Sequence, residues 1–111
     1  MYRLITTTAF LVVAVCGASL ARADEPSFDI AIQNHQFNPT ELQVPAGVKI
    51  RLTIKNMDAT AEEFDSDDLH REKVVPGGHE AVVVIGPLKP GTYRFMGEYH
   101  QATAQGRIIA K

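Results

Sequence analysis

The residues most able to do chemistry lie near the end of the chain. Residues 91–100 read GTYRFMGEYH and residues 106–109 read GRII, which indicates a strand, an exposed loop with a histidine, and a second strand. The loop holds His100, and Met96 and Glu98 stand shortly before it. Imidazole and carboxylate groups suit Cu(II), iron, Mn(II) and Zn(II), whereas a thioether favours Cu(I). No cysteine stands in this loop, so the sequence predicts a metal site without a thiolate ligand.

Further candidate ligands are spread along the chain, and each also has a simpler interpretation. A lone histidine in a β protein is most often a surface or satisfied core residue, a loop carboxylate is usually solvated, and methionine usually fills the core. His70 and His79 stand beside turns, and we interpret both as surface residues. The candidates, none of which forms a strong local metal signature, are His35, Met57, Glu62, Glu63, Asp65, His70, His79, Met96, Glu98 and His100.

Short strands separated by turns must position these side chains. In residues 48–54, apolar side chains alternate with polar ones, which predicts a strand with one buried face. Residues 81–85 form a continuous apolar run, which predicts a strand buried on both faces. About seven such strands alternate with Pro/Gly turns, and no segment shows a helical period. The sequence therefore predicts an all-β, antiparallel sandwich with Greek-key connections.

The first 23 residues are typical of a cleavable signal peptide. Arg3 precedes a mostly apolar stretch, and residues 21–23 read Ala-Arg-Ala, a small-x-small cleavage site. Cys16 follows a valine where a lipoprotein site needs a small residue, so cleavage after Ala23 is preferred over lipidation. Residues 24–111 would then form a single 88-residue domain without cysteine, in which no disulfide can form.

The net charge of the chain limits the kinds of partner that it is expected to bind. Removal of residues 1–23 changes the balance from 11 basic and 13 acidic residues to 9 and 13, a net charge of −4. A mildly acidic surface argues against nucleic acid and anionic lipid, and it is compatible with cations. Tryptophan is absent and aromatic residues are few, so no base-stacking platform is predicted.

Three segments resemble the cupredoxin family. They are F37-x-P39-x-x-L42-x-V44-P45-A46-G47, L52-x-I54-x-N56 and K89-P90-G91-T92-Y93-x-F95, and the similarity extends over roughly residues 28–110. The resemblance implies a cupredoxin-like Greek-key β-sandwich with metal at one end. It also places Glu62 where these proteins have their first histidine ligand and Gly97 where they have cysteine, while His100 keeps the second histidine. These departures predict that a blue copper site is absent.

A narrower family shares the same departures. The segments E62-E63-F64-D65-S66, E72-K73-V74-V75, and G97-E98-Y99-H100 with T103-A104-Q105-G106 are similar to the cupredoxin-like domains of bacterial ferrous-iron uptake systems. These are the amino-terminal domain of EfeO and the stand-alone FtrB-type protein. The resemblance implies a periplasmic, copper-dependent factor that oxidises Fe(II). Its partners would be a membrane iron permease or a periplasmic metal-binding companion protein.

The resemblance also implies a ligand set. The loop that holds His35 would return to the metal end if the chain follows the cupredoxin path. Adjacent strand residues point to opposite faces, so only one of Glu62 and Glu63 can face a given metal, and we favour Glu62. The predicted metal ligands are His100, Glu62, His35, Glu98 and Met96, with copper as the resident ion and Fe(II) as a possible substrate.

Two other functions fit the same residues. The protein could be a periplasmic copper or iron chaperone that binds metal without turnover. It could also be an interaction domain that has lost its metal, because sandwiches readily host other functions.

Overall fold

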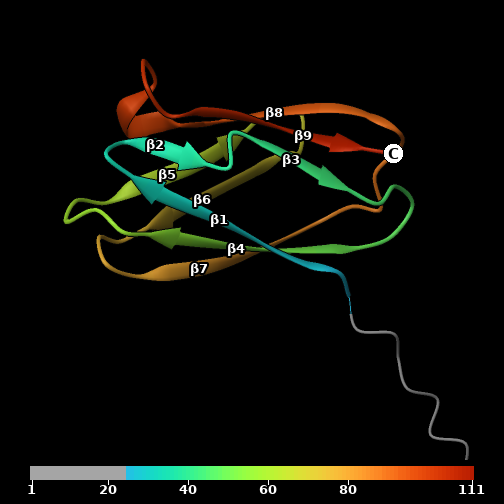
Figure 1. Ribbon diagram of the computed structural model, residues 1–111, viewed down its shortest axis with the longest axis horizontal. Coiled ribbons are helices and arrows are strands. Elements are labelled where there is room, and N and C mark those ends of the chain that lie inside the picture. Colours follow the sequence, from blue (N-terminus) through green and yellow to red (C-terminus); the bar gives the residue numbers. More distant parts are fainter. Residues whose placement is uncertain (1–24) are drawn as a thin grey trace, which may run out of the picture.

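The computed structural model describes residues 25–111, so the predicted signal peptide lies outside the described residues. Two sheets pack face to face, as the two layers in Figure 1 show. The first sheet has the strand order β2-β1-β4-β7, with bounds Gln36–Asn38, Ser27–Gln33, Ile50–Asn56 and Glu80–Ile85. The second has the order β3-β9-β8-β5-β6, with bounds Glu41–Val44, Gln105–Ala110, Gly91–Gly97, Glu62–Ser66 and Arg71–Val75. A 3-10 turn, η1 (Glu98–His100), follows β8.

The predicted all-β sandwich is confirmed, with two differences in detail. The described residues contain nine strands where about seven were predicted, among them the three-residue strand β2. The pairing is also not wholly antiparallel, since β1 pairs with β4, and β3 with β9, in parallel. Among the described residues no helix is long and apolar enough to cross a membrane.

Alternating side chains of both sheets fill the space between them. In β4, Ile50, Leu52 and Ile54 are fully buried, while Arg51 between them is exposed. Three phenylalanines bridge the layers: the Phe37 and Phe95 rings meet edge to face at 4.9 Å. Phe64 lies 5.1 Å from Phe95. Burying such rings against one another is the main source of stability in a domain of this size, which has no disulfide among its described residues.

The prediction that residues 81–85 are buried on both faces is wrong. They belong to β7, which lies at an edge of the first sheet. Val82 and Val84 point outward and are 39% and 38% exposed, while Val83 and Ile85 are buried. A run of β-branched residues satisfies strand propensity on either face, so the run alone does not tell a central strand from an edge strand.

Candidate metal centre

His35 is carried by a tight turn between β1 and β2. Gln33 pairs with Gln36, which leaves Asn34 and His35 as a two-residue hairpin loop. Their φ angles are 52° and 56°, so both residues adopt the left-handed conformation that this kind of turn requires. The His35 carbonyl accepts a hydrogen bond from the Thr103 hydroxyl at 2.7 Å, which ties the turn to the last loop.

Glu62 is the first residue of β5, and its carboxyl group is enclosed by protein. The residue is 1% exposed. Its Oε1 accepts hydrogen bonds from the backbone N–H groups of Tyr99 at 3.0 Å and of Glu63 at 3.1 Å. Its Oε2 faces Nδ1 of His100. A buried carboxylate is tolerated only with such partners, because it would otherwise lose its hydration without compensation.

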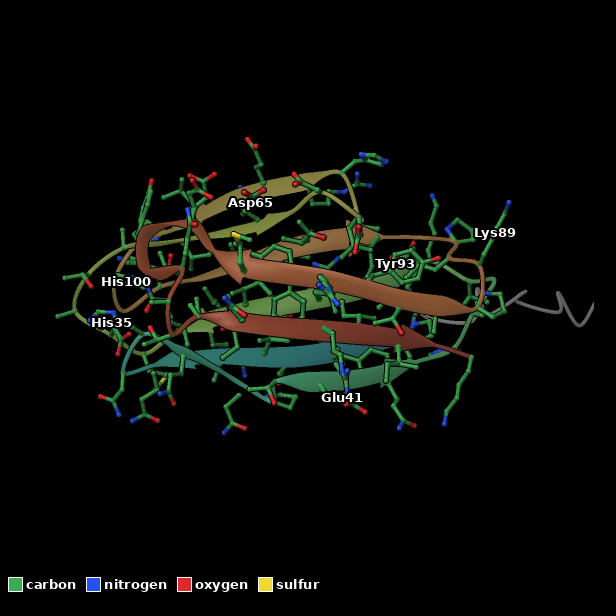
Figure 2. All side chains as sticks on the ribbon, turned by 90° about the horizontal axis from the view of Figure 1, so that it is seen from above. His35, Glu41, Asp65, Lys89, Tyr93 and His100 are labelled. Atoms are coloured by element: carbon green, nitrogen blue, oxygen red, sulfur yellow. The ribbon has the colours of Figure 1, made fainter. Side chains whose placement is uncertain are left out.

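His100 ends the η1 turn and brings the three side chains together. Its ring stacks on the ring of His35, with centroids 3.6 Å apart and planes at 18°. His35, Glu62 and His100 each offer one atom that could bind a metal, and these three atoms all lie within 4.8 Å of one another. Figure 2 shows the two histidines side by side at one end of the sandwich, with Lys89 and Tyr93 toward the other end. The predicted residues His35, Glu62 and His100 therefore lie together in one site. Metal binding by these residues stays a prediction.

Gly97 makes room for the Glu62 carboxyl group. A Cβ atom at this position would lie 2.6 Å from Cδ of Glu62 and 2.7 Å from Cβ of Ala104. The backbone of Gly97 is extended, with φ at −92°, so the need for glycine is steric and not conformational. At the position where the resemblance to cupredoxins expects a cysteine, the structure has no room for any side chain while Glu62 stays in place.

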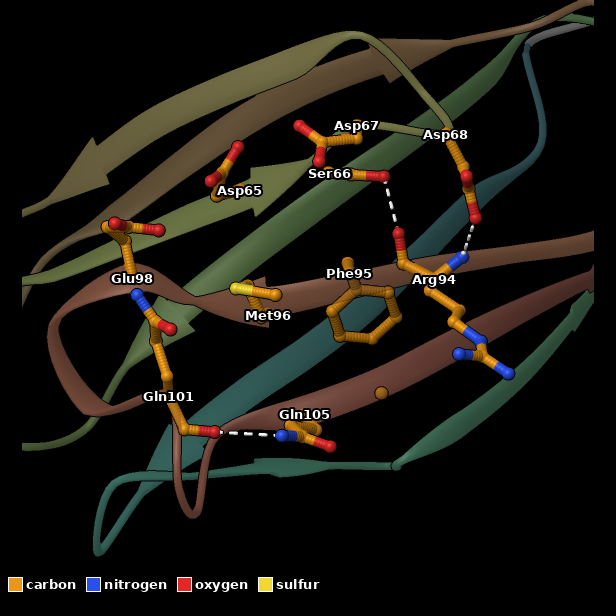
Figure 3. A pocket seen from close by; sticks show the side chains of 11 residues that line it. Asp65, Ser66, Asp67, Asp68, Arg94, Phe95, Met96, Glu98, Gln101 and Gln105 are labelled. Carbon is orange, nitrogen blue, oxygen red and sulfur yellow. Dashed lines mark hydrogen bonds between the residues drawn. The ribbon is translucent and has the colours of Figure 1, made fainter.

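Glu98 and Met96 lie away from this site. Phe95 of β8 is buried, so alternation along the strand puts Met96 on the other face of the sheet. Met96 pairs there with Asp65 of the neighbouring strand β5. Glu98 lines the same surface pocket as Met96 and Asp65, as Figure 3 shows. Desolvation raises the pKa of the Glu98 carboxyl group, and the neighbouring Asp65 raises it further. The structure thus does not bring Glu98 or Met96 to the two histidines.

The other candidates are also apart from the site. Met57, His70 and His79 are exposed. Glu63 points to the outer face of β5, where its carboxylate lies near those of Asp65 and Glu72. The structure therefore places Glu62, and not Glu63, beside the histidines.

Sequence reasoning missed Asp58, which contacts the His35 turn. Its Oδ1 accepts a hydrogen bond from the Asn34 N–H at 2.8 Å, and its Oδ2 accepts one from the His35 N–H at 3.0 Å. The His35 backbone hydrogen bond is the main reason that the pKa of the Asp58 carboxyl group is lowered. Nothing local in the sequence links Asp58 to a residue 23 positions earlier, because the contact depends on how β1 and β4 align.

The donor set fits a transition-metal ion. Two imidazoles and one carboxylate oxygen suit Cu(II), iron or Zn(II), and the structure offers no thiolate among its described residues. Oε1 of Glu62 accepts from two amides, whereas Oε2 contacts only Nδ1 of His100, so a metal bound through Oε2 would replace that contact. The His35 and His100 side chains are 44% and 28% exposed, so one side of the site is open to solvent.

The fold and site define a class: a two-sheet β-sandwich with two histidines and a buried glutamate gathered at one end. The chain belongs to the cupredoxin-like domain family, whose sequence model matches residues 5–110. An uncharacterized protein of Rickettsia prowazekii (strain Madrid E) is 51% identical over 80 residues, which cover 72% of this chain. The match spans 64% of that relative, so this chain corresponds to less than two thirds of it.

Solved structures agree on the fold. Auracyanin A, a "blue" copper protein of Chloroflexus aurantiacus, is similar with a TM-score of 0.68 and 17% identity, over 77% of this chain and 98% of that one. The metal-binding domain of the Cu(I)-exporting P-type ATPase CopA of Streptococcus pneumoniae D39 has a TM-score of 0.62 and 15% identity, over 77% and 84%. At these identities the likeness establishes the cupredoxin-like fold.

Proposed function

We propose that this protein binds copper through His35, Glu62 and His100 and assists iron uptake in the periplasm by oxidising Fe(II). The observation that carries the proposal is the convergence of two imidazoles and one buried carboxylate oxygen within 4.8 Å of one another. Copper-binding proteins among the structural neighbours, and the resemblance of the sequence to iron-uptake cupredoxin domains, support the choice of metal and substrate.

The affinity order of divalent metals favours copper at such a site. For a given set of nitrogen and oxygen ligands, Cu(II) binds more tightly than the other common first-row divalent ions. When bound, copper would supply a one-electron acceptor, and Fe(II) would be the substrate that is oxidised to Fe(III). The electron would then leave to a membrane partner with a redox group of its own, and the Fe(III) would pass to a membrane iron permease or a periplasmic metal-binding companion protein.

Each residue has a separate task in this proposal. Glu62 supplies a negative charge that is fixed by two backbone amides and so needs no reorganisation when a cation arrives. His100 and His35 supply neutral nitrogen donors on the solvent side, where a second ion or a partner can approach. Gly97 keeps a side chain out of the space that the carboxylate occupies.

Copper binding is tested by titration calorimetry of the purified protein with Cu(II). We expect one saturable site, which His100→Ala and Glu62→Ala weaken by at least tenfold. His79→Ala is the matched control, because it removes an exposed imidazole that lies outside the cluster, and it should leave the affinity unchanged. Equal binding by the wild type and both site variants would refute the proposal.

A second candidate is a metal chaperone without turnover. The exposure of both imidazoles favours it, because open ligands can be exchanged with a partner protein. The two functions are separated by following Fe(II) loss with the copper-loaded protein and with the same concentration of free copper. Faster Fe(II) loss with the protein supports the oxidase role, whereas saturable copper binding without faster oxidation supports the chaperone.

A further inference from the structure

The turn at Asn34 and His35 contains a histidine in an uncommon backbone conformation. In a two-residue hairpin loop with positive φ at both positions, asparagine is common at the first and glycine at the second. Asn34 fits this preference, but His35 occupies the second position with φ at 56°. This conformation is uncommon for a residue with a Cβ atom, although histidine adopts it more often than most, and exposed His70 also adopts it, with φ at 54°. Where such a residue belongs to a functional site, contacts around it offset the cost.

We propose that Asp58 is a positioning residue of the metal site, which holds the Asn34–His35 turn so that the His35 imidazole lies against His100 and Glu62. This inference rests on the proposed metal-binding function. The two carboxylate oxygens each accept one of two successive backbone N–H groups, from Asn34 at 2.8 Å and from His35 at 3.0 Å. Hydrogen bonds to an ionised acceptor are stronger than neutral ones, so they can stabilise an unfavourable turn.

Asp58 is itself fixed to the sandwich. Its N–H donates to Oδ1 of Asn56 at 3.0 Å, and its carbonyl accepts from the N–H of Gly78 at 3.0 Å. Asn56 is 2% exposed, and its amide group donates to the carbonyls of Thr60 and Val75. The carboxylate is therefore held on a buried polar network at the end of β4 and not on a free loop.

The opposite side of the turn is anchored as well. The hydroxyl of Thr103 donates to the His35 carbonyl, so the backbone of His35 is held at its N–H by Asp58 and at its carbonyl by Thr103. With its backbone fixed on both sides, the His35 ring lies stacked on the His100 ring. Nδ1 of His35 lies 3.6 Å from Oδ2 of Asp58, which is an ion-pair distance but too long for a hydrogen bond.

Asp58 is not a fourth ligand of the cluster. The ligand atoms that lie within 4.8 Å of one another come from His35, Glu62 and His100, and Asp58 is absent from that group of described residues. Both of its oxygens already accept backbone hydrogen bonds. We therefore infer that it acts through His35. A direct attraction between its charge and a bound cation would instead persist when His35 is removed.

A double-mutant cycle in the full chain tests this dependence. We expect Asp58→Ala to weaken Cu(II) binding about tenfold or more, the scale seen for residues that orient metal ligands. In the His35→Ala background the same change should cost no further affinity. Asp58→Asn should lie between, because its amide keeps one acceptor, and Asp29→Ala removes an exposed carboxylate on β1 as the control.

A metal-free measurement separates this inference from the proposed function. In the copper-free protein, the ring protons of stacked His35 and His100 should resonate upfield, and Asp58→Ala should remove that shift. Failure of the wild type to bind copper would refute the proposed function while leaving this readout to decide the positioning role. Unchanged ring shifts in Asp58→Ala, or an equal loss of affinity with and without His35, would overturn the inference. Should Asp58→Ala not fold, Asp58→Asn serves for both measurements.

Discussion

Replacement of His35 by glycine or by alanine should separate the stability of the fold from the function of the site. Both changes remove the imidazole and its 3.6 Å stack on His100, so both should lower the Cu(II) affinity by the same factor. They differ in one respect only. Alanine keeps the Cβ atom at φ 56°, and glycine does not.

The difference in stability follows from that atom. The left-handed conformation costs a residue with a Cβ atom about 1–2 kcal/mol. Glycine avoids this cost, but it loses more backbone entropy on folding, which offsets about 0.5 kcal/mol of the gain in stability. His35→Gly should therefore be more stable than His35→Ala by about 1 kcal/mol, equal to about 4–8 °C in Tm for a domain of this size.

Urea unfolding of the two copper-free variants, with the wild type as reference, measures this difference. Loss of the exposed ring stack costs about 0.5 kcal/mol in both variants, so His35→Gly should match or exceed the wild type while His35→Ala falls below it. Calorimetry on the same preparations should show equally weakened copper binding. If alanine proved as stable as glycine, the turn would not be strained, and the reasoning that links strain to function would fail.

Three further predictions concern the ligand pocket and its outer face. Gly97→Ala should destabilise the protein by about 1–3 kcal/mol in urea unfolding, because its Cβ atom would lie 2.6 Å from Cδ of Glu62, whereas Gly91→Ala meets only ordinary contacts and should be nearly neutral. The copper-loaded protein should lack the intense visible band of thiolate-bound copper, and a strong blue colour in the absorption spectrum would contradict the ligand set. Glu98→Gln should raise Tm at pH 7, because desolvation and Asp65 raise the Glu98 pKa and so disfavour its ionised form in the fold. That gain should vanish as the pH falls below the ordinary value of 4.5, where the carboxyl group is protonated in both states; a gain that persisted at pH 3 would show another cause.

Strand alternation predicted much of the architecture. The buried side chains of β4 follow the predicted pattern from Ile50 to Ile54, but Val48 lies before the strand and is 41% exposed. Turns with proline or glycine follow β2, β3, β6 and β7. The prediction failed where the structure depends on which strands lie next to one another in a sheet. Whether the valines of β7 face a neighbour or water depends on its position at the sheet edge, and β2 is a strand because β1 lies beside it.

The positions of the predicted ligand side chains also depend partly on local alternation and partly on packing. Alternation along a strand puts Glu62 and Glu63 on opposite faces, and it also puts Met96 on the face opposite Phe95. Which of these faces carries the histidines is a matter of packing. Glu98 was predicted from its closeness to His100 in sequence, but the η1 turn directs it toward Asp65 on the outer surface.

By itself, the sequence determined an all-β sandwich, the residue types available as ligands and the lack of a cysteine in the last loop, because these depend on composition and on the two-residue period of strands. Only the tertiary structure decided that His35, Glu62 and His100 meet, since the three come from different elements far apart in the chain. It also decided that Gly97 serves to admit the Glu62 carboxyl group and that Asp58 holds the His35 turn. Contacts of this kind depend on strand register and on the packing of the two sheets, which no local pattern of residues encodes.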